Sequence, residues 1–183
     1  MASKQLLRKK YIRLRKRKYF PVSKNFFFPV IQKFKIILKK KRSKIALYYP
    51  AISEVNVLKI MELKLLKKFK ILLPVIKGQQ IKFCEWSKID VMKVNKFGIL
   101  EPALYSKYMC PDIILVPLLA YDEKKNRLGY GKGYYDRFLN NLLKKNGNIT
   151  TVGVAFSFQK HQKIPTSFRD IKLNNILTEK GII

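Results

Sequence analysis

Residues 112–143 read DIILVPLLAYDEKKNRLGYGKGYYDRFLNNLL and hold three kinds of sequence in a row. The first is an apolar run, Asp112–Tyr121, which is typical of a strand buried on both faces of a parallel sheet. The second is a glycine-rich connection with glycines at 129, 131 and 133. The third is a helical pattern that we expect to begin near Tyr134. The stretch therefore predicts a strand, a loop and a helix of a parallel α/β sheet.

The same kind of alternation extends outward from this stretch. We expect a very basic helix over residues 3–18 and a second helix after Pro29, within FFFPVIQKFKIILKK. We also expect an amphipathic helix over residues 53–70, capped by Ser53 and buried through Leu58, Met61, Leu65 and Phe69. GILEP, residues 98–102, reads as part of a loop. The remaining strands are expected within residues 43–50, 71–77, 81–86, 150–158 and 174–183.

Strands that alternate with helices favour an α/β sandwich with a largely parallel sheet. No internal repeat and no Ser- or Gly-rich linker is visible, so we expect a single domain over residues 1–183. In such sheets, ligands bind beyond the carboxyl ends of the strands. The glycines follow the most hydrophobic strand, so they lie where an anion site is expected.

The composition leaves two interpretations of the charge open. The formal net charge is +29, from 40 Lys and Arg against 11 Asp and Glu. One interpretation is a nucleic-acid-binding protein, because phosphate neutralisation is the main source of such affinity. The other is compositional drift, which the even spread of the cations and the abundance of Lys, Ile, Asn, Phe and Tyr favour. No apolar run approaches the roughly 18 residues that a membrane helix needs.

The glycine-rich stretch has the chemistry of a phosphate site. Its amides can form a concave anion site, and the positive end of the following helix points to the same place. Lys132 can neutralise a phosphate, Arg127 can bind one through two hydrogen bonds, and Asp136 can hold a magnesium ion. The spacing alone also fits a tight strand-to-helix connection packed by tyrosines. The added charges favour a nucleoside triphosphate.

Several motifs, in order along nearly the whole chain, resemble the 5-formyltetrahydrofolate cyclo-ligase family. They are KQLLRK, YYPAISEV, GILEP, PDIILVPLLAYD, RLGYGKGYYDR, GVAFSFQ and IPTSFRDIKLNNILTE. The resemblance implies a three-layer, Rossmann-like fold related to sugar-phosphate isomerases and CoA transferases. It also implies an enzyme that uses ATP and Mg²⁺ to convert 5-formyltetrahydrofolate into 5,10-methenyltetrahydrofolate, with release of ADP and phosphate.

The resemblance carries the family's site residues onto this chain. The ATP-binding residues it implies are Lys4, Gln5, Leu6, Leu7, Arg8, Arg127, Leu128, Gly129, Tyr130, Gly131, Lys132, Gly133, Tyr134 and Tyr135. The folate-binding residues it implies are Tyr49, Glu54, Tyr130, Gly131, Lys132, Gly133 and Tyr134. Asp136 and Asp170 match the magnesium positions, and Arg127, Lys132 and Tyr134 are the expected catalytic residues. Relatives often have a basic residue where this chain has Tyr130.

Two other classes remain as alternatives to the enzyme. A basic nucleic-acid-binding protein would use Tyr108, Tyr134 and Tyr135 as stacking platforms. An inactive relative would keep the fold and lose the reaction, which the presence of Arg127, Lys132 and both aspartates disfavours. For the enzyme we expect a cytoplasmic monomer with a small-molecule substrate, no specific nucleic acid and no membrane association.

Overall fold

The computed structural model of the chain describes residues 3–35, 43–144 and 149–183. Its centre is a seven-stranded sheet in the order β11-β10-β9-β6-β1-β2-β3. The strands of this sheet are β1 (Lys44–Ala46), β2 (Lys70–Lys77), β3 (Gln80–Glu85), β6 (Ile113–Pro117), β9 (Thr150–Val154), β10 (Asn175–Thr178) and β11 (Gly181–Ile182). The helices are α1 (Lys4–Lys18), α2 (Phe28–Lys33) and α4 (Tyr134–Lys144), with short 3₁₀ helices η1 (Lys24–Phe27), η2 (Val57–Glu62), η3 (Lys64–Lys68) and η4 (Ser157–Gln159).

The middle of the sheet is parallel and both of its edges are antiparallel. β6 pairs in parallel with β1 and β9, and the parallel set extends to β2 and β10. β3 and β11 close the edges as antiparallel strands. The expected α/β class with a largely parallel sheet is confirmed. The apolar run that opens the quoted stretch forms β6, which is buried on both faces through Ile113, Ile114, Leu115 and Val116.

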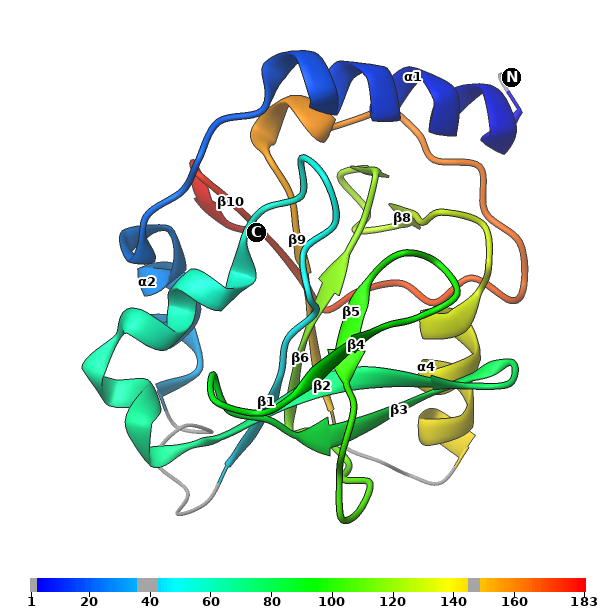
Figure 1. Cartoon of the computed structure of the whole chain (residues 1–183). Coiled ribbons are helices and arrows are strands. Elements are labelled where there is room, and N and C mark those ends of the chain that lie inside the picture. Colours follow the sequence, from blue (N-terminus) through cyan, green and yellow to red (C-terminus); the bar gives the residue numbers. More distant parts are fainter. Residues whose placement is uncertain (1–2, 36–42, 145–148) are drawn as a thin grey trace.

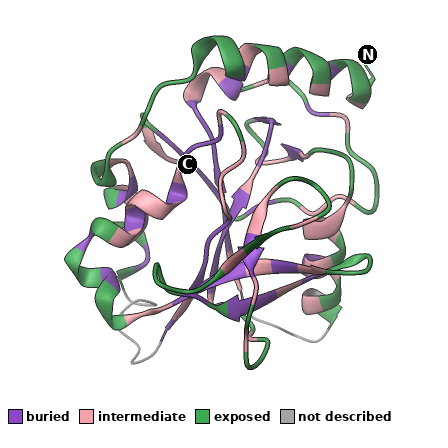
Figure 2. Ribbon diagram, viewed as in Figure 1, coloured by how far each residue is buried: buried purple, intermediate pink, exposed green. Residues whose placement is uncertain are grey.

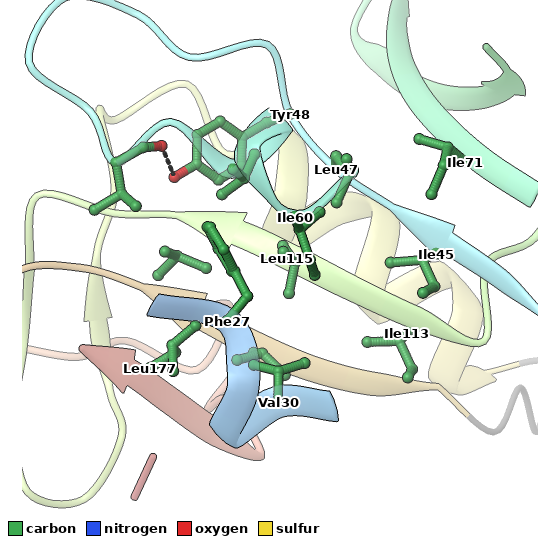
Figure 3. Close-up of a cluster of buried hydrophobic side chains, with 14 of the residues drawn as sticks. Phe27, Val30, Ile45, Leu47, Tyr48, Ile60, Ile71, Ile113, Leu115 and Leu177 are labelled. Carbon is green, nitrogen blue, oxygen red and sulfur yellow. Dashed lines mark hydrogen bonds between the residues drawn. The ribbon is translucent and has the colours of Figure 1, made fainter. Parts of the chain in front are cut away.

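Two apolar layers cover the two faces of the sheet. On one face, α2, η2 and η3 pack on a cluster that includes Phe27, Ile60 and Leu115 (Figure 3). On the other face, α4 packs through Leu139 against residues such as Ile114 and Phe83. Figure 1 shows these helices on opposite sides of the sheet, and Figure 2 shows the buried strands between them.

Helix α1 lies across the carboxyl ends of the strands rather than on either face (Figure 1). It packs Leu7 and Tyr11 against Leu119, Leu128 and Ile164 in a third apolar cluster. The hairpin β7 (Ala120–Tyr121) and β8 (Arg127–Leu128) follows β6 and leads into the glycine loop beneath this helix. Helix α1 therefore packs at the carboxyl ends of the strands, where a ligand is expected.

Residues 53–70 correct one expectation. They form two 3₁₀ helices, and the buried residues recur every third position: Val57, Ile60, Leu63 and Leu66. A 3₁₀ helix has three residues per turn, so positions three apart share a face. The expected buried set was wrong: Leu65 is 43% exposed, and Leu58, Met61 and Phe69 are only partly buried.

The expected cap of that segment was also wrong. Ser53 has a positive φ of 62° and lies in a turn. The Asn56 side chain caps η2 instead, because it accepts a hydrogen bond from the Leu58 amide.

Two other regions differ in part from the sequence-based expectations. GILEP lies in a hairpin of β4 (Met92–Val94) and β5 (Leu100–Pro102) rather than in a loop. The helix expected after Pro29 appears as α2, while residues 36–40 of its motif lie outside the described residues. None of the helices in the described part of the chain is long and apolar enough to cross a membrane.

Candidate active site

Helix α1 has a row of cationic side chains that faces the carboxyl ends of the strands. Lys4, Arg8 and Arg15 are spaced four and seven residues apart, so they lie on one side of the helix together with Leu7 and Tyr11. The Arg8 Nε donates a hydrogen bond to the Gly129 carbonyl at 2.9 Å. The Lys4 ammonium lies 2.5 Å from a carboxylate oxygen of Asp170. The helix thus meets both the glycine loop and the segment before β10.

The glycine loop, residues 129–133, has a backbone conformation that favours glycine at two positions. Gly131 has a φ of 96°, and a Cβ there would lie 3.0 Å from the Arg8 guanidinium carbon. Gly133 has a φ of 68°, and a Cβ there would lie 2.9 Å from the Arg137 guanidinium. These positive φ values favour glycine. Gly129, by contrast, does not have a positive φ.

Lys132 lies at the exposed tip of this loop, next to the start of α4. Its ammonium stands over the Phe97 ring, 6.0 Å from the ring centroid. Phe97 also packs edge-on against Tyr134, with ring centroids 5.7 Å apart. Because helix N-termini attract anions, the open ammonium and the helix dipole favour negative charge at the same place.

Arg127 is buried and already paired. Its NH1 donates to Asp136 Oδ1 at 2.8 Å and to the Ile171 carbonyl at 3.3 Å. Burial lowers the pKa of Arg127, and the charges of Asp136 and Asp170 oppose this shift. The arginine that we expected to face a phosphate therefore holds Asp136 in this structure.

The two predicted magnesium carboxylates each keep one oxygen open. Asp136 uses Oδ1 for Arg127 and the Ile171 amide, and Asp170 uses Oδ2 for Lys4 and Ser167. Within the described ranges, no hydrogen bond reaches Asp136 Oδ2 or Asp170 Oδ1, and no group of three or more His, Cys, Asp and Glu is present. Magnesium is commonly held by one or two carboxylates together with phosphates and water, so these residues fit such an ion.

Besides the glycine loop and the two aspartates, the candidate site contains a buried carboxylate, that of Glu54. Glu54 is 7% exposed, and its Oε2 accepts a hydrogen bond from the Ala51 amide at 2.8 Å. Its Oε1 accepts a short hydrogen bond from the Tyr130 hydroxyl, in the glycine loop. The Arg15 NH1 lies 3.6 Å from the same oxygen, and the Arg15 guanidinium stands over the Tyr130 ring at 5.5 Å. A carboxylate, a guanidinium and a phenol thus meet beneath α1.

The charge of Glu54 acts on three tyrosines. Burial raises the pKa of Tyr48, Tyr130 and Tyr135, and the charge of Glu54 raises each of them further. All three phenols stay protonated at neutral pH and can act as hydrogen-bond donors. Tyr48 donates to the Val55 carbonyl at 3.0 Å, which fixes the turn that carries Glu54 (Figure 3).

The remaining predicted site residues differ in how far they are exposed. Leu7 and Leu128 are buried in the cluster under α1, so they can meet a nucleotide only through their backbone. Gln5 and Leu6 are exposed on α1. Tyr49 packs against the core on the α2 side, and Tyr48 is the neighbour whose pKa responds to Glu54.

Two residues of the site were not found from the sequence. Arg15 lies on the inner face of α1, and its spacing of seven from Arg8 is the signal that could have revealed it. Phe97 lies at the tip of the β4–β5 hairpin, far along the chain from the glycine loop that it contacts. No local pattern links these positions, because the contacts form only in the folded chain.

The fold is that of an α/β protein with a largely parallel sheet, and helix α1 and the glycine loop lie at the carboxyl ends of its strands (Figure 1). The sequence model of the 5-formyltetrahydrofolate cyclo-ligase family matches residues 1–179. The chain is 33% identical, over 149 residues, to a 5-formyltetrahydrofolate cyclo-ligase of Haemophilus influenzae, covering 78% of this chain and 79% of that protein.

Solved structures agree with this match. The NMR structure of the 5,10-methenyltetrahydrofolate synthetase of Aquifex aeolicus is similar, with a TM-score of 0.73, 34% identity and coverage of 98% of this chain and 91% of that one. A 5,10-methenyltetrahydrofolate synthetase from Mycoplasma pneumoniae follows at a TM-score of 0.69, 25% identity and coverage of 96% and 98%. The chain belongs to the 5-formyltetrahydrofolate cyclo-ligase family, and it is an enzyme.

Proposed function

We propose that this enzyme converts 5-formyltetrahydrofolate into 5,10-methenyltetrahydrofolate and couples the ring closure to hydrolysis of ATP to ADP and phosphate. The observation that carries the proposal is the position of the glycine loop. Lys132 in that loop is exposed beside the N-terminus of α4, while Tyr130, two residues earlier, contacts the buried Glu54. One short loop can therefore hold a γ-phosphate and a folate next to each other.

The chemistry requires a leaving group rather than a protein nucleophile. A formamide carbonyl is a poor electrophile, and its oxygen does not leave as water easily. Attack of the formyl oxygen on the γ-phosphorus breaks the bond to ADP and turns that oxygen into part of a phosphate. The amine at position 10 then attacks the formyl carbon, the bond from carbon to the phosphate oxygen breaks, and the amine loses its proton. Closure is fast because both partners belong to one molecule.

The residues of this chain would supply position and charge. Lys132, Arg8 and the loop amides suit the oxygens of the transferring phosphoryl group, where stabilising the developing charge dominates catalysis. Arg127 acts through Asp136, which it holds by a hydrogen bond at 2.8 Å. Glu54 and Tyr134 face the folate side, and the Phe97 ring packs against Tyr134.

Asp136 and Asp170 would hold a magnesium ion, which would neutralise part of the phosphate charge. Each aspartate is already oriented by a cation of the protein, Asp136 by Arg127 and Asp170 by Lys4. These ion pairs set the direction of the open carboxylate oxygens before a ligand arrives.

The test is the near-ultraviolet absorbance of the methenyl product, followed on mixing protein, 5-formyltetrahydrofolate and ATP with magnesium. We expect the absorbance to rise only when all components are present, with one ADP formed per product. The control omits each component in turn and replaces ATP by a non-hydrolysable analogue. A folded protein that leaves 5-formyltetrahydrofolate unchanged in the complete mixture would exclude this function.

A further inference from the structure

We propose that Arg15 is a specificity-determining residue, which together with Glu54 recognises the lactam edge of the pterin, the ring carbonyl and its neighbouring N–H. This inference rests on the proposed function, because it names how that substrate would be bound. Arg15 lies outside the residues that the family resemblance implied, and its role follows from its surroundings in the fold.

Arg15 is a buried charge with unused donors. It is 5% exposed, and its NH2 donates to the Ile52 carbonyl at 3.2 Å. Its Nε and NH1 are buried without any hydrogen-bond acceptor among the described residues. Leaving buried donors of a charged group unpaired is costly, so such groups in a folded protein call for an explanation. A ligand acceptor that arrives at these two nitrogens would remove the cost.

The neighbouring charge indicates which acceptor that is. The Arg15 Nη1 lies 3.6 Å from Glu54 Oε1, so the donors of a guanidinium and a carboxylate acceptor lie side by side at one buried point. A phosphate or carboxylate would meet repulsion from Glu54 at this point. A lactam edge presents one acceptor beside one donor, which matches the guanidinium and the carboxylate in turn. The pterin of a folate has such an edge.

Tyr130 occupies the place that the ligand would take. Its hydroxyl donates to Glu54 Oε1, and its ring covers the Arg15 guanidinium at 5.5 Å. The phenol therefore already makes the hydrogen bond to Glu54 that a lactam N–H would make. Tyr130 is 42% exposed, so rotation of its side chain toward solvent would free Glu54 Oε1 and the face of the Arg15 guanidinium for the ligand.

The experiment measures binding of two folates to the whole protein without ATP, by calorimetry. One is 5-formyltetrahydrofolate, and the other is its analogue in which an amino group replaces the pterin carbonyl. The amino group offers a donor where Arg15 needs an acceptor, so we expect the wild type to prefer the natural folate by at least about a hundredfold. Arg15→Met should weaken binding of the natural folate about 10- to 100-fold and reduce the preference to below about threefold.

Two further variants serve as a control and as a substitute for Arg15→Met. Arg17→Met removes the same charge from the exposed side of α1 and should leave both affinities within about twofold of the wild type. Arg15→Lys keeps a charge opposite Glu54, so it serves if Arg15→Met does not fold, and it should also lose most of the preference because it lacks the planar fork.

The outcomes separate the two proposals. A folded Arg15 variant that binds both folates as the wild type does would overturn the role of Arg15. A wild type that shows the preference, binds ATP and forms no methenyl product would overturn the proposed function and leave the role of Arg15 standing.

Discussion

Two buried arginines lie near the carboxyl ends of the strands, and they differ in the hydrogen bonds that their guanidinium nitrogens make. Arg127 is 8% exposed, contacts Asp136 at 2.8 Å, and also bonds to the Ile171 carbonyl. Arg15 is 5% exposed, stands 3.6 Å from Glu54, and has two nitrogens without an acceptor in the described part of the chain. The protein holds one arginine at hydrogen-bond distance from a carboxylate, and it leaves two buried nitrogens of the other without an acceptor among the described residues.

The difference shows how burial and pairing together separate a structural charge from a binding charge. A satisfied arginine fixes its carboxylate partner and adds to stability. An unsatisfied buried arginine detracts from stability until a ligand arrives. Lys132 is a third case, because it is exposed and has no desolvation cost before it meets a phosphate. Its effect should therefore appear in the rate alone.

The largest effect should come from Lys132→Ala. Loss of one charge placed against a transferring phosphoryl group typically lowers the rate about a hundred- to a thousandfold. Lys132→Arg should restore only part of it, because a planar fork replaces a compact ammonium poorly in a tight loop. The measurements are turnover at saturating ATP and a thermal melt.

Lys124→Ala is the matched control for that prediction. Lys124 is an exposed lysine of the same hairpin that precedes the loop. Its removal should change turnover by no more than about twofold. A well-folded Lys132→Ala protein with near-normal turnover would show that the phosphate is held elsewhere and that the loop is only a connection.

Replacing each arginine together with its carboxylate tests the comparison on stability. Arg127→Met with Asp136→Asn removes hydrogen bonds to charged groups and should destabilise the fold by about 2 to 3 kcal/mol. Arg15→Met with Glu54→Gln removes a pair with unsatisfied donors and should change stability by less than about 1 kcal/mol, or increase it. Urea unfolding measures both. Equal losses for the two pairs would mean that Arg15 is as structural as Arg127.

The ion pair between Lys4 and Asp170 should give the smallest effect and a pH signature. Burial raises the pKa of Asp170, but hydrogen bonds from Lys4 and Ser167 outweigh it, so the pKa lies below its ordinary value. A depressed carboxyl pKa stabilises the fold above the ordinary value of about 3.9, and this contribution is lost as the pH falls through the folded pKa.

A double-mutant cycle with Lys4→Met and Asp170→Asn measures this contribution. The coupling energy should be at most about 1 kcal/mol at neutral pH and should disappear as the pH falls through the depressed pKa of Asp170 in the folded protein. A coupling that persists at low pH would mean that the two side chains interact through packing rather than charge.

The fold was predictable where local chemistry and long-range packing agree. The buried strand β6, the glycine loop and the start of α4 at Tyr134 all follow from the quoted stretch. The prediction for the segment after Ser53 was wrong because the spacing of its apolar residues fits both an α-helix and a 3₁₀ helix. An α-helical reading selects Leu58, Met61 and Leu65, whereas the folded chain buries every third residue from Val57. Packing against the sheet determines which of the two helix types forms, and the sequence of the segment alone carries no information about that packing.

The site was predictable only where its residues are close in sequence. Lys132, Asp136 and the glycines form one motif, and Lys4, Arg8, Glu54 and Asp170 entered through the resemblance to a family. The sequence gives no sign that Arg15 is buried, because eight other residues of the fifteen in α1 are also Lys or Arg. The residues that Arg15 contacts, Ile52, Glu54 and Tyr130, lie far from it in the sequence. The contact of Lys132 with Phe97 likewise depends on a distant hairpin.

The most direct measurement of the proposed chemistry follows the formyl oxygen. 5-Formyltetrahydrofolate labelled with ¹⁸O in the formyl group is converted by the wild type with unlabelled ATP, and the released phosphate is analysed by mass spectrometry. If the formyl oxygen attacks the γ-phosphorus, each phosphate carries one ¹⁸O atom for each methenyl product formed. Unlabelled phosphate, with the label lost to water, would contradict phosphorylation of the formyl oxygen at this site.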